Sequence, residues 1–99
     1  MNLTSKQRAY LRGLANHTEA LFQVGKSSLT PELTAAVQEA FNTREIIKLS
    51  VLKNCQDDPR ELGEMIAERT GATFVCSIGK KLILYKPFKE KPEIILPKA

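Results

Sequence analysis

Hydrophobic residues along the chain follow two periodicities, one typical of helices and the other typical of strands. From residue 4 to residue 16 the apolar side chains recur at helical spacing and share one face: Tyr10, Leu11, Leu14 and Ala15. Thr4 and Gln7 have the spacing of a capping box, in which each side chain bonds to the backbone of the other residue. We therefore expect a helix that begins after Thr4, ends near Asn16 and buries Tyr10 in the core.

Two further helices are predicted, each by an N-cap residue that a proline follows directly. Thr30-Pro31 begins the first of them, and Asp58-Pro59 begins the second, which Gly71 ends. An apolar stripe runs along the first of these helices, at Leu33, Val37, Ala40 and Phe41, and the face of the second that we expect to be buried is Leu62, Met65 and Ile66.

Four strands are predicted in the remaining segments, at residues 21–24, 45–52, 72–78 and 81–86. The last two flank Gly79-Lys80, a two-residue hairpin turn. Cys76 alternates with Phe74 and Ile78 in its strand, so we expect it in the core. The order of elements predicts an α/β fold, an N-terminal helix followed by β-α-β-α-β-β, with a four-stranded mixed sheet backed by helices. We expect most strands to be parallel and the closing hairpin to add an antiparallel strand.

The chain has 99 residues, which is the length of one domain with a single core. We place this domain at residues 1–88. Prolines recur beyond that point, at Pro92 and Pro97, and we expect residues 89–99 to form an extended tail with a short strand at 93–96.

Charge and chemistry narrow the possible functions. Lysine and arginine outnumber aspartate and glutamate by 15 to 11, and the net charge of +4 favours an anionic partner. The charge is uneven, since residues 80–99 are rich in lysine and residues 57–69 are acidic. The cysteines, Cys55 and Cys76, and the single histidine, His17, do not have the spacing of a structural metal site.

Other features indicate where the protein acts. Free cysteines without a CxxC pair are typical of a reducing cytosol. The first six residues lack the apolar core of a signal peptide, and no apolar run approaches the length of a membrane span. We therefore expect a cytoplasmic protein that uses no metal or other cofactor and has no catalytic residues.

The sequence Gly25-Lys26-Ser27-Ser28 carries the main functional signal, because it joins an apolar strand to a helix start. Backbone N–H groups and a lysine at such a junction suit a phosphate group. A nucleotide-binding P-loop would need its first glycine at position 20, which is Ala20 here, so the pattern argues against an NTPase. Two interpretations remain open: a clamp on a sugar-phosphate backbone, as in KH domains, or a plain turn with Gly25 at a positive φ.

Four segments of the chain carry a resemblance to a known family: residues 3–12, the Phe-Gln-Val-Gly-Lys run at 22–26, residues 44–49, and residues 78–81 with 84–87. In these segments, and in their order, the chain resembles the CRM domain (chloroplast RNA splicing and ribosome maturation), above all its stand-alone bacterial YhbY-type members. The resemblance implies an RNA-binding domain similar in fold to the C-terminal domain of translation initiation factor three. It also implies association with precursors of the large ribosomal subunit, and no catalysis.

The chain departs from the family pattern at its loop. Ser28 stands where the family's G-K-x-G loop has its second glycine, and serine adopts a positive φ at a higher energetic cost. Whether this change weakens RNA binding stays open. Lys80 and Lys86 stand where arginines are common, which keeps the positive charge but loses the bidentate guanidinium.

We expect RNA to be held mainly through its phosphates. Tyr85 could stack on a base, but its place in a strand favours the core. The predicted RNA-binding residues are Lys6, Arg8, Arg12, Gly25, Lys26, Ser27, Ser28, Lys48, Lys80, Lys81 and Lys86. The expected function is that of a monomeric factor that binds ribosomal RNA and assists assembly of the large subunit, with no membrane or small-molecule substrate. The alternative is an adaptor that docks a protein on the acidic helix 59–70 or on the C-terminal tail.

Overall fold

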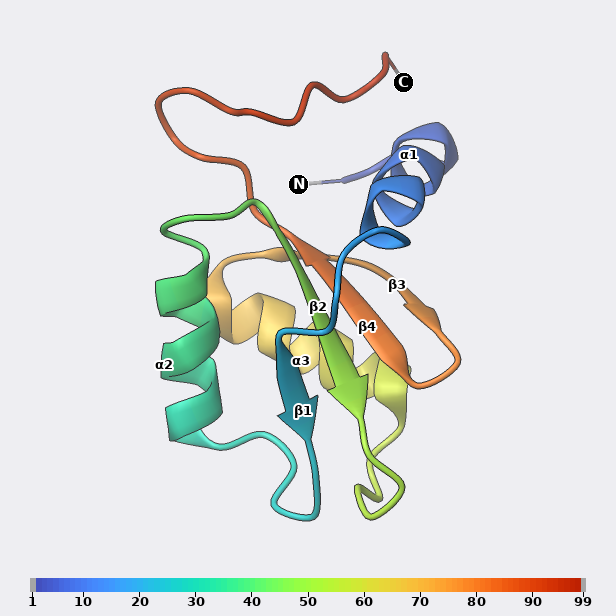
Figure 1. The fold of residues 1–99 in the computed structure, drawn as a ribbon, viewed down its shortest axis with the longest axis vertical. Helices are drawn as coiled ribbons and strands as arrows, with labels where there is room; N and C mark the ends of the chain where they lie inside the picture. Colours follow the sequence, from blue (N-terminus) through green and yellow to red (C-terminus); the bar gives the residue numbers. More distant parts are fainter. Residues whose placement is uncertain (1, 99) are drawn as a thin grey trace.

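The computed structural model describes residues 2–98 as three helices and four strands, in the predicted order (Figure 1). The helices are α1 (Ser5–Ala15), α2 (Pro31–Ala40) and α3 (Pro59–Thr70). The strands are β1 (Phe22–Val24), β2 (Ile46–Val51), β3 (Thr73–Ile78) and β4 (Lys81–Tyr85). Residue 1 of the expected domain and residue 99 of the expected tail lie outside the described residues.

The strands form one mixed sheet in the order β1-β2-β4-β3, which confirms the predicted fold class. The pairing is less parallel than expected. β1 pairs with β2 in parallel, whereas β4 is antiparallel to both β2 and β3. The reason is that β4 inserts between β2 and β3 (Figure 1), and so separates two strands that point in the same direction.

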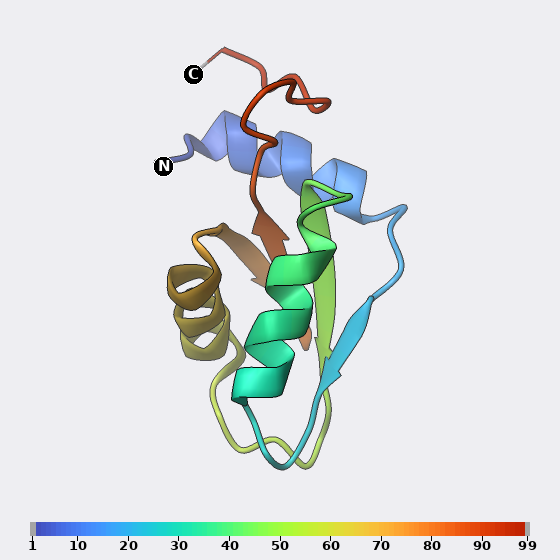
Figure 2. The same cartoon turned by 90° about the vertical axis from the view of Figure 1, so that its left-hand side faces the viewer.

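Helices cover both faces of the sheet. α2 and α3 pack on one face, and α1 packs on the other face near the end where β2 begins (Figure 2). Successive side chains of β4 divide between the two layers. Leu82 and Leu84 join the larger core under α2 and α3, while Ile83 and Tyr85 join Leu11 of α1 in a second cluster.

Local capping explains why each helix begins where the sequence predicts. Thr4 and Gln7 form the capping box, with Gln7 N donating to Thr4 Oγ1 at 3.1 Å. Thr30 accepts from Leu33 N at 3.1 Å, and Asp58 caps α3 in the same way. These side chains satisfy N–H groups that the first helical turn leaves without a partner.

Two expected core residues are exposed instead. Tyr10 is 42% exposed and Met65 is 40% exposed, so the predictions that they are buried were wrong. Each precedes a fully buried residue, Leu11 or Ile66, and neighbouring side chains on a helix point about 100° apart. The buried stripe on each helix is therefore narrower than the run of apolar residues suggests.

A β-bulge interrupts β3. Its register against β4 shifts between Phe74 and Cys76, so that Val75 is an extra residue. Phe74 packs against the core under α2 and α3, whereas Cys76 packs against the α1 cluster and is only half-buried. The prediction that Cys76 and Phe74 share one core face was wrong, because a bulge breaks the period of two.

The C-terminal tail is held against the domain, and the expected strand at 93–96 does not form. Glu45, which is 4% exposed, accepts hydrogen bonds from three backbone N–H groups, one at the end of the domain and two in the tail. These come from Phe88 at 2.7 Å, Glu93 at 2.9 Å and Ile94 at 2.7 Å. Ile94 also packs against the α1 cluster, and the tail passes beside α1 (Figure 2).

Candidate nucleic-acid interface

Three connecting segments leave the sheet at the end where β1, β2 and β3 finish; in Figure 1 the loops after β1 and β2 lie at the bottom, and the turn after β3 lies at the lower right. They are the loop 25–30 after β1, the loop 52–58 after β2, and the Gly79-Lys80 turn after β3; we call them together the loop edge. Backbone hydrogen bonds join them, since Leu52 N donates to Val24 O at 2.8 Å and Val51 N donates to Lys80 O at 2.7 Å. The topology therefore assembles segments that are distant in the sequence.

Each segment of the loop edge carries one exposed lysine, namely Lys26, Lys53 and Lys80. Lys81 follows at the start of β4, where its ammonium bonds to the Ser50 hydroxyl. Our sequence interpretation missed Lys53. The signal that would have found it is its place directly after β2, because the carboxyl ends of parallel strands lie at the same edge of a sheet.

The Gly-Lys-Ser-Ser loop is a tight turn in which Ser28 N donates to Gly25 O at 2.9 Å. Ser28 has a φ of 55°, whereas Gly25 is not in the positive region, so the interpretation of Gly25 as the positive-φ residue was wrong. A Cβ on Gly25 would lie 3.4 Å from Asn54 Oδ1, and the missing side chain lets the two loops approach.

A side-chain contact supports the unusual conformation of Ser28. Its hydroxyl donates to the carboxylate of Asp57, in the second loop of the loop edge. A left-handed conformation costs a non-glycine residue about 1 kcal/mol or more. The bond to Asp57 offsets part of this cost and ties loop 25–30 to loop 52–58.

Three of the predicted RNA-binding side chains donate to backbone carbonyls of the fold. Arg8 Nη1 donates to Phe74 O at 2.7 Å and to Val75 O at 2.6 Å, across the bulge. Lys48 Nζ donates to Ala15 O at 3.2 Å, and Lys86 Nζ donates to Thr70 O at 3.0 Å. Lys86 thus bonds a carbonyl at the end of α3, and Lys48 adds a second bond to Ala15 O, which also accepts from Thr18 N at 3.0 Å.

The predicted site residues fall into two groups. The loop edge brings together Gly25, Lys26, Ser27, Ser28, Lys80 and Lys81. The others lie on α1 or around its end of the sheet, and they are Lys6, Arg8, Arg12, Lys48 and Lys86. Figure 1 shows α1 at the end of the sheet opposite to the loop edge. The predicted site residues are therefore divided between the two ends of the sheet.

The pKa values of two side chains near α1, Tyr85 and Cys76, are raised. Burial, and then the negative charge of Glu45, raise the pKa of Tyr85 above its usual value. Burial also raises the pKa of the Cys76 thiol, and the nearby guanidinium groups of Arg12 and Arg8 oppose that shift. Tyr85 is only 2% exposed, so it belongs to the core and presents no face for a base.

Within residues 2–98, no group of His, Cys, Asp and Glu side chains is arranged to hold a metal ion. Over the same range, none of the helices has the length and apolar character that crossing a membrane requires.

Comparisons with known proteins show what the whole chain is similar to. The sequence model of the CRS1/YhbY (CRM) domain matches residues 3–86. A probable RNA-binding protein of Bacillus subtilis is 39% identical over 95 residues, which cover 96% of this chain and 99% of that protein. An RNA-binding protein of Haemophilus influenzae is 33% identical over 96 residues, covering 97% and 96% of the two chains.

A solved structure has a similar fold. It is the solution structure of a hypothetical Staphylococcus aureus protein, described as a candidate RNA binder. The two proteins are 38% identical in sequence, and their structures superpose with a TM-score of 0.82. The match covers 97% of this chain and 100% of the other.

Proposed function

The chain belongs to the CRS1/YhbY (CRM) domain family, and from this premise we propose that it binds RNA through its loop edge and assists assembly of the large ribosomal subunit. Relatives that match nearly the whole chain are described as RNA-binding proteins rather than as enzymes. The observation that carries the proposal is the convergence of Lys26, Lys53 and Lys80, each exposed and each from a different segment.

The proposed contact is made to the RNA backbone. Loop 25–30 leads directly into α2, so the positive end of this helix dipole lies beside the loop. Lys26 adds a full charge beside this helix start, and Lys53 and Lys80 extend the positive surface along the loop edge. These groups suit successive phosphates of one RNA strand and make no contact with a base. Such a surface fits RNA that is recognised by shape and charge.

Such a protein acts by holding RNA, without catalysis. In the assembly of a ribosomal subunit, a bound factor of this kind would restrict the folding of precursor RNA at its site. We propose that it does so in the cytoplasm, as a monomer, on precursor RNA of the large subunit.

The first test is RNA binding by Lys26→Ala over a range of salt concentrations. We expect weaker binding to every RNA tested, and a salt slope smaller by about one, because one phosphate contact is lost. Lys89→Ala is the matched control, since Lys89 is an exposed lysine of the tail, outside the loop edge. Equal affinities of the Lys26 variant and the wild type would remove the loop from the mechanism.

A second test separates RNA binding from the adaptor function. After crosslinking in cells, we expect RNA fragments of large-subunit precursors to be recovered with the wild type and to be depleted with Lys26→Ala. Co-sedimentation with ribosomal particles should be lost after nuclease treatment. An adaptor that docks on α3 or on the tail would instead keep its protein partner after the RNA has been digested.

A further inference from the structure

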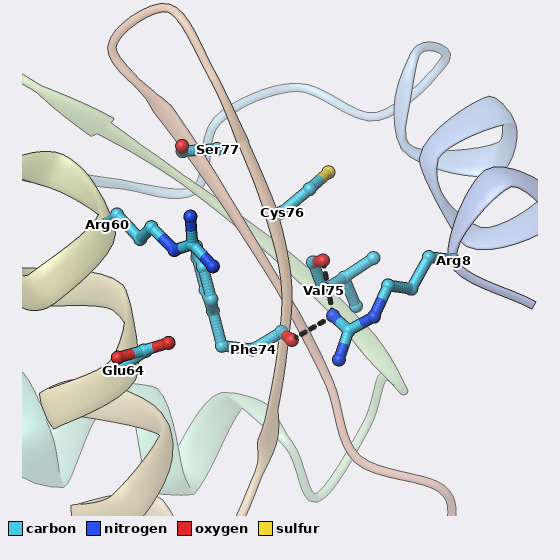
Figure 3. Close-up of a pocket in the computed structure, with 7 residues that line it drawn as sticks. All are labelled: Arg8, Arg60, Glu64, Phe74, Val75, Cys76 and Ser77. Carbon is cyan, nitrogen blue, oxygen red and sulfur yellow. Dashed lines mark hydrogen bonds between the residues drawn. The ribbon is translucent and has the colours of Figure 1, made fainter. Parts of the chain in front are cut away.

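The outer side of β3 forms the floor of an open groove of about 410 Å³, with α1 on one side and α3 on the other (Figure 3). β3 is an edge strand of the sheet. Arg8 reaches the groove from α1, and Arg60 and Glu64 reach it from α3. This groove is separate from the loop edge, and the proposed RNA contacts described above do not use it.

The edge of β3 is poorly suited to pair with another strand. The bulge at Val75 disrupts its ladder, and Arg8 already donates to the carbonyls of Phe74 and Val75. An added peptide strand needs regularly spaced carbonyl acceptors along the edge. Because the Arg8 guanidinium already occupies two neighbouring carbonyls of β3, the groove does not fit an extended peptide.

The two arginines, the aromatic ring and the hydroxyl of the groove suit a planar ligand with an anionic group, and Glu64 is the one acidic residue of the lining. Figure 3 shows the Arg60 guanidinium beside the Phe74 ring, and the Ser77 hydroxyl on the same side of β3. Arg60 is exposed, whereas Phe74 is fixed from behind by α3, since a Cβ on Gly63 would lie 2.4 Å from the Phe74 ring. Guanidinium planes and aromatic rings are the surfaces on which unpaired bases stack.

We infer that this groove binds one unpaired nucleotide of the RNA. A base would stack on the Arg60 guanidinium, with the Ser77 hydroxyl in reach of a polar edge. A phosphate would pair with the remaining donors of Arg8, because an arginine bonded through one nitrogen keeps others available. A cleft of this volume lies within the roughly 300–1,000 Å³ of typical small-ligand sites.

The inference rests on the proposed RNA binding and adds a second point of contact. The groove would recognise one nucleoside monophosphate unit, and this unit occurs both in RNA and as a free nucleotide. The groove lies along the strand that leads to the Gly79-Lys80 turn, so RNA held at the loop edge can continue into it.

The test compares Arg60→Ala with Arg69→Ala, in titrations with a single-stranded RNA octamer and with free adenosine and uridine monophosphates. Both arginines are exposed residues of α3, and Arg69 does not line the groove, so the pair is matched in charge. We expect Arg60→Ala to lose about fivefold or more in affinity for the octamer relative to Arg69→Ala, which is the loss of one stacked base.

NMR locates the contact. When the octamer binds the wild type, the amide signals of residues 74–77 should shift. Lys26→Ala should bind the octamer with lower affinity, but the same signals should still shift once the variant is saturated with RNA. Shifts at 74–77 with the free monophosphates alone would assign the groove to a free nucleotide and overturn the RNA contact.

Other outcomes separate the two proposals. If the wild-type protein does not bind the octamer at all, both the proposed function and this inference are wrong. If Lys26→Ala weakens binding while Arg60→Ala behaves as Arg69→Ala does, with no shifts at 74–77, the loop edge stands and the groove falls. Shifts produced by an extended acidic peptide, and not by RNA, would make the groove a protein-docking site.

Discussion

At the scale of single residues, Ser28 shows how the chain accommodates a departure from its family's loop. Its positive φ of 55° is the conformation that glycine adopts at little cost. The Ser28 hydroxyl donates to Asp57, and so compensates through a neighbouring loop. Ser28 therefore adopts a conformation that favours glycine, with a side-chain bond to Asp57 to support it.

This compensation predicts coupling between Ser28 and Asp57. Asp57→Ala should lower the free energy of unfolding by about 0.5–1 kcal/mol in the wild type, because the hydroxyl loses its acceptor. In a Ser28→Gly background, the same change should cost less, since the hydroxyl is already absent. Urea unfolding of the four proteins measures the coupling energy. Equal costs of Asp57→Ala in both backgrounds would show that the bond contributes nothing.

The Ser28→Gly protein also answers the open question about binding. We expect its RNA affinity to match or exceed that of the wild type, because glycine adopts the same φ without strain. A clear loss of affinity would mean that the serine hydroxyl, or the rigidity that its bond to Asp57 gives the loop, takes part in holding RNA.

Tyr85 predicts a dependence of stability on alkaline pH. Its pKa is raised in the folded protein by burial and by Glu45, so folding favours the protonated phenol. That stability is present below the unfolded value of about 10 and is lost as pH rises through the folded pKa. Thermal unfolding should show a steeper loss above pH 10 for the wild type than for Tyr85→Phe. Parallel curves for the two proteins would contradict this account.

At the scale of elements, Glu45 determines how the tail is attached. Its buried carboxylate accepts three backbone N–H groups, and a carboxamide offers one oxygen where the carboxylate offers two. Glu45→Gln should therefore lower the free energy of unfolding by about 1.5–3 kcal/mol. It should also raise the rate of amide hydrogen exchange at residues 88, 93 and 94.

The control for the tail is Glu90→Gln, which makes the same change at an exposed position of the tail. It should leave both stability and exchange rates near those of the wild type. If Glu45→Gln lowers stability without faster exchange in the tail, the carboxylate matters to the core rather than to tail attachment.

The elements also separate what the sequence could predict from what it could not. Helix starts were predictable, because Thr4, Thr30 and Asp58 act on N–H groups within three residues of themselves. The bulge at Val75 and the central place of β4 depend on pairing between distant strands, which local patterns do not encode. For the same reason, the loop motif was predictable as a turn, whereas its neighbour Lys53 and its tie to Asp57 were not.

At the scale of the whole molecule, positive charge from distant segments gathers at one end of the sheet. This predicts that the salt dependence of RNA binding has a localised origin. A triple variant, Lys26→Ala, Lys53→Ala and Lys80→Ala, should reduce the salt slope by about two to three, because each lysine neutralises one phosphate.

The matched control replaces three tail lysines, Lys89, Lys91 and Lys98, with alanine, which removes the same net charge. All three are exposed and lie outside the loop edge. Filter binding between low and moderate salt measures both slopes. Similar reductions in the two triple variants would mean that RNA responds to total charge and not to the loop edge.

The position of β4 has a consequence for how the protein is made. β4 lies between β2 and β3 and pairs with both, yet it is the last strand of the chain. A nascent chain that has emerged only as far as β3 thus contains two halves of a sheet with nothing to join them. The sheet can close only once β4 has left the exit tunnel, because no strand made earlier joins β2 to β3. Pairing of the sheet therefore waits for its central strand, whereas the β1–β2 pair can form before β3 has been synthesised.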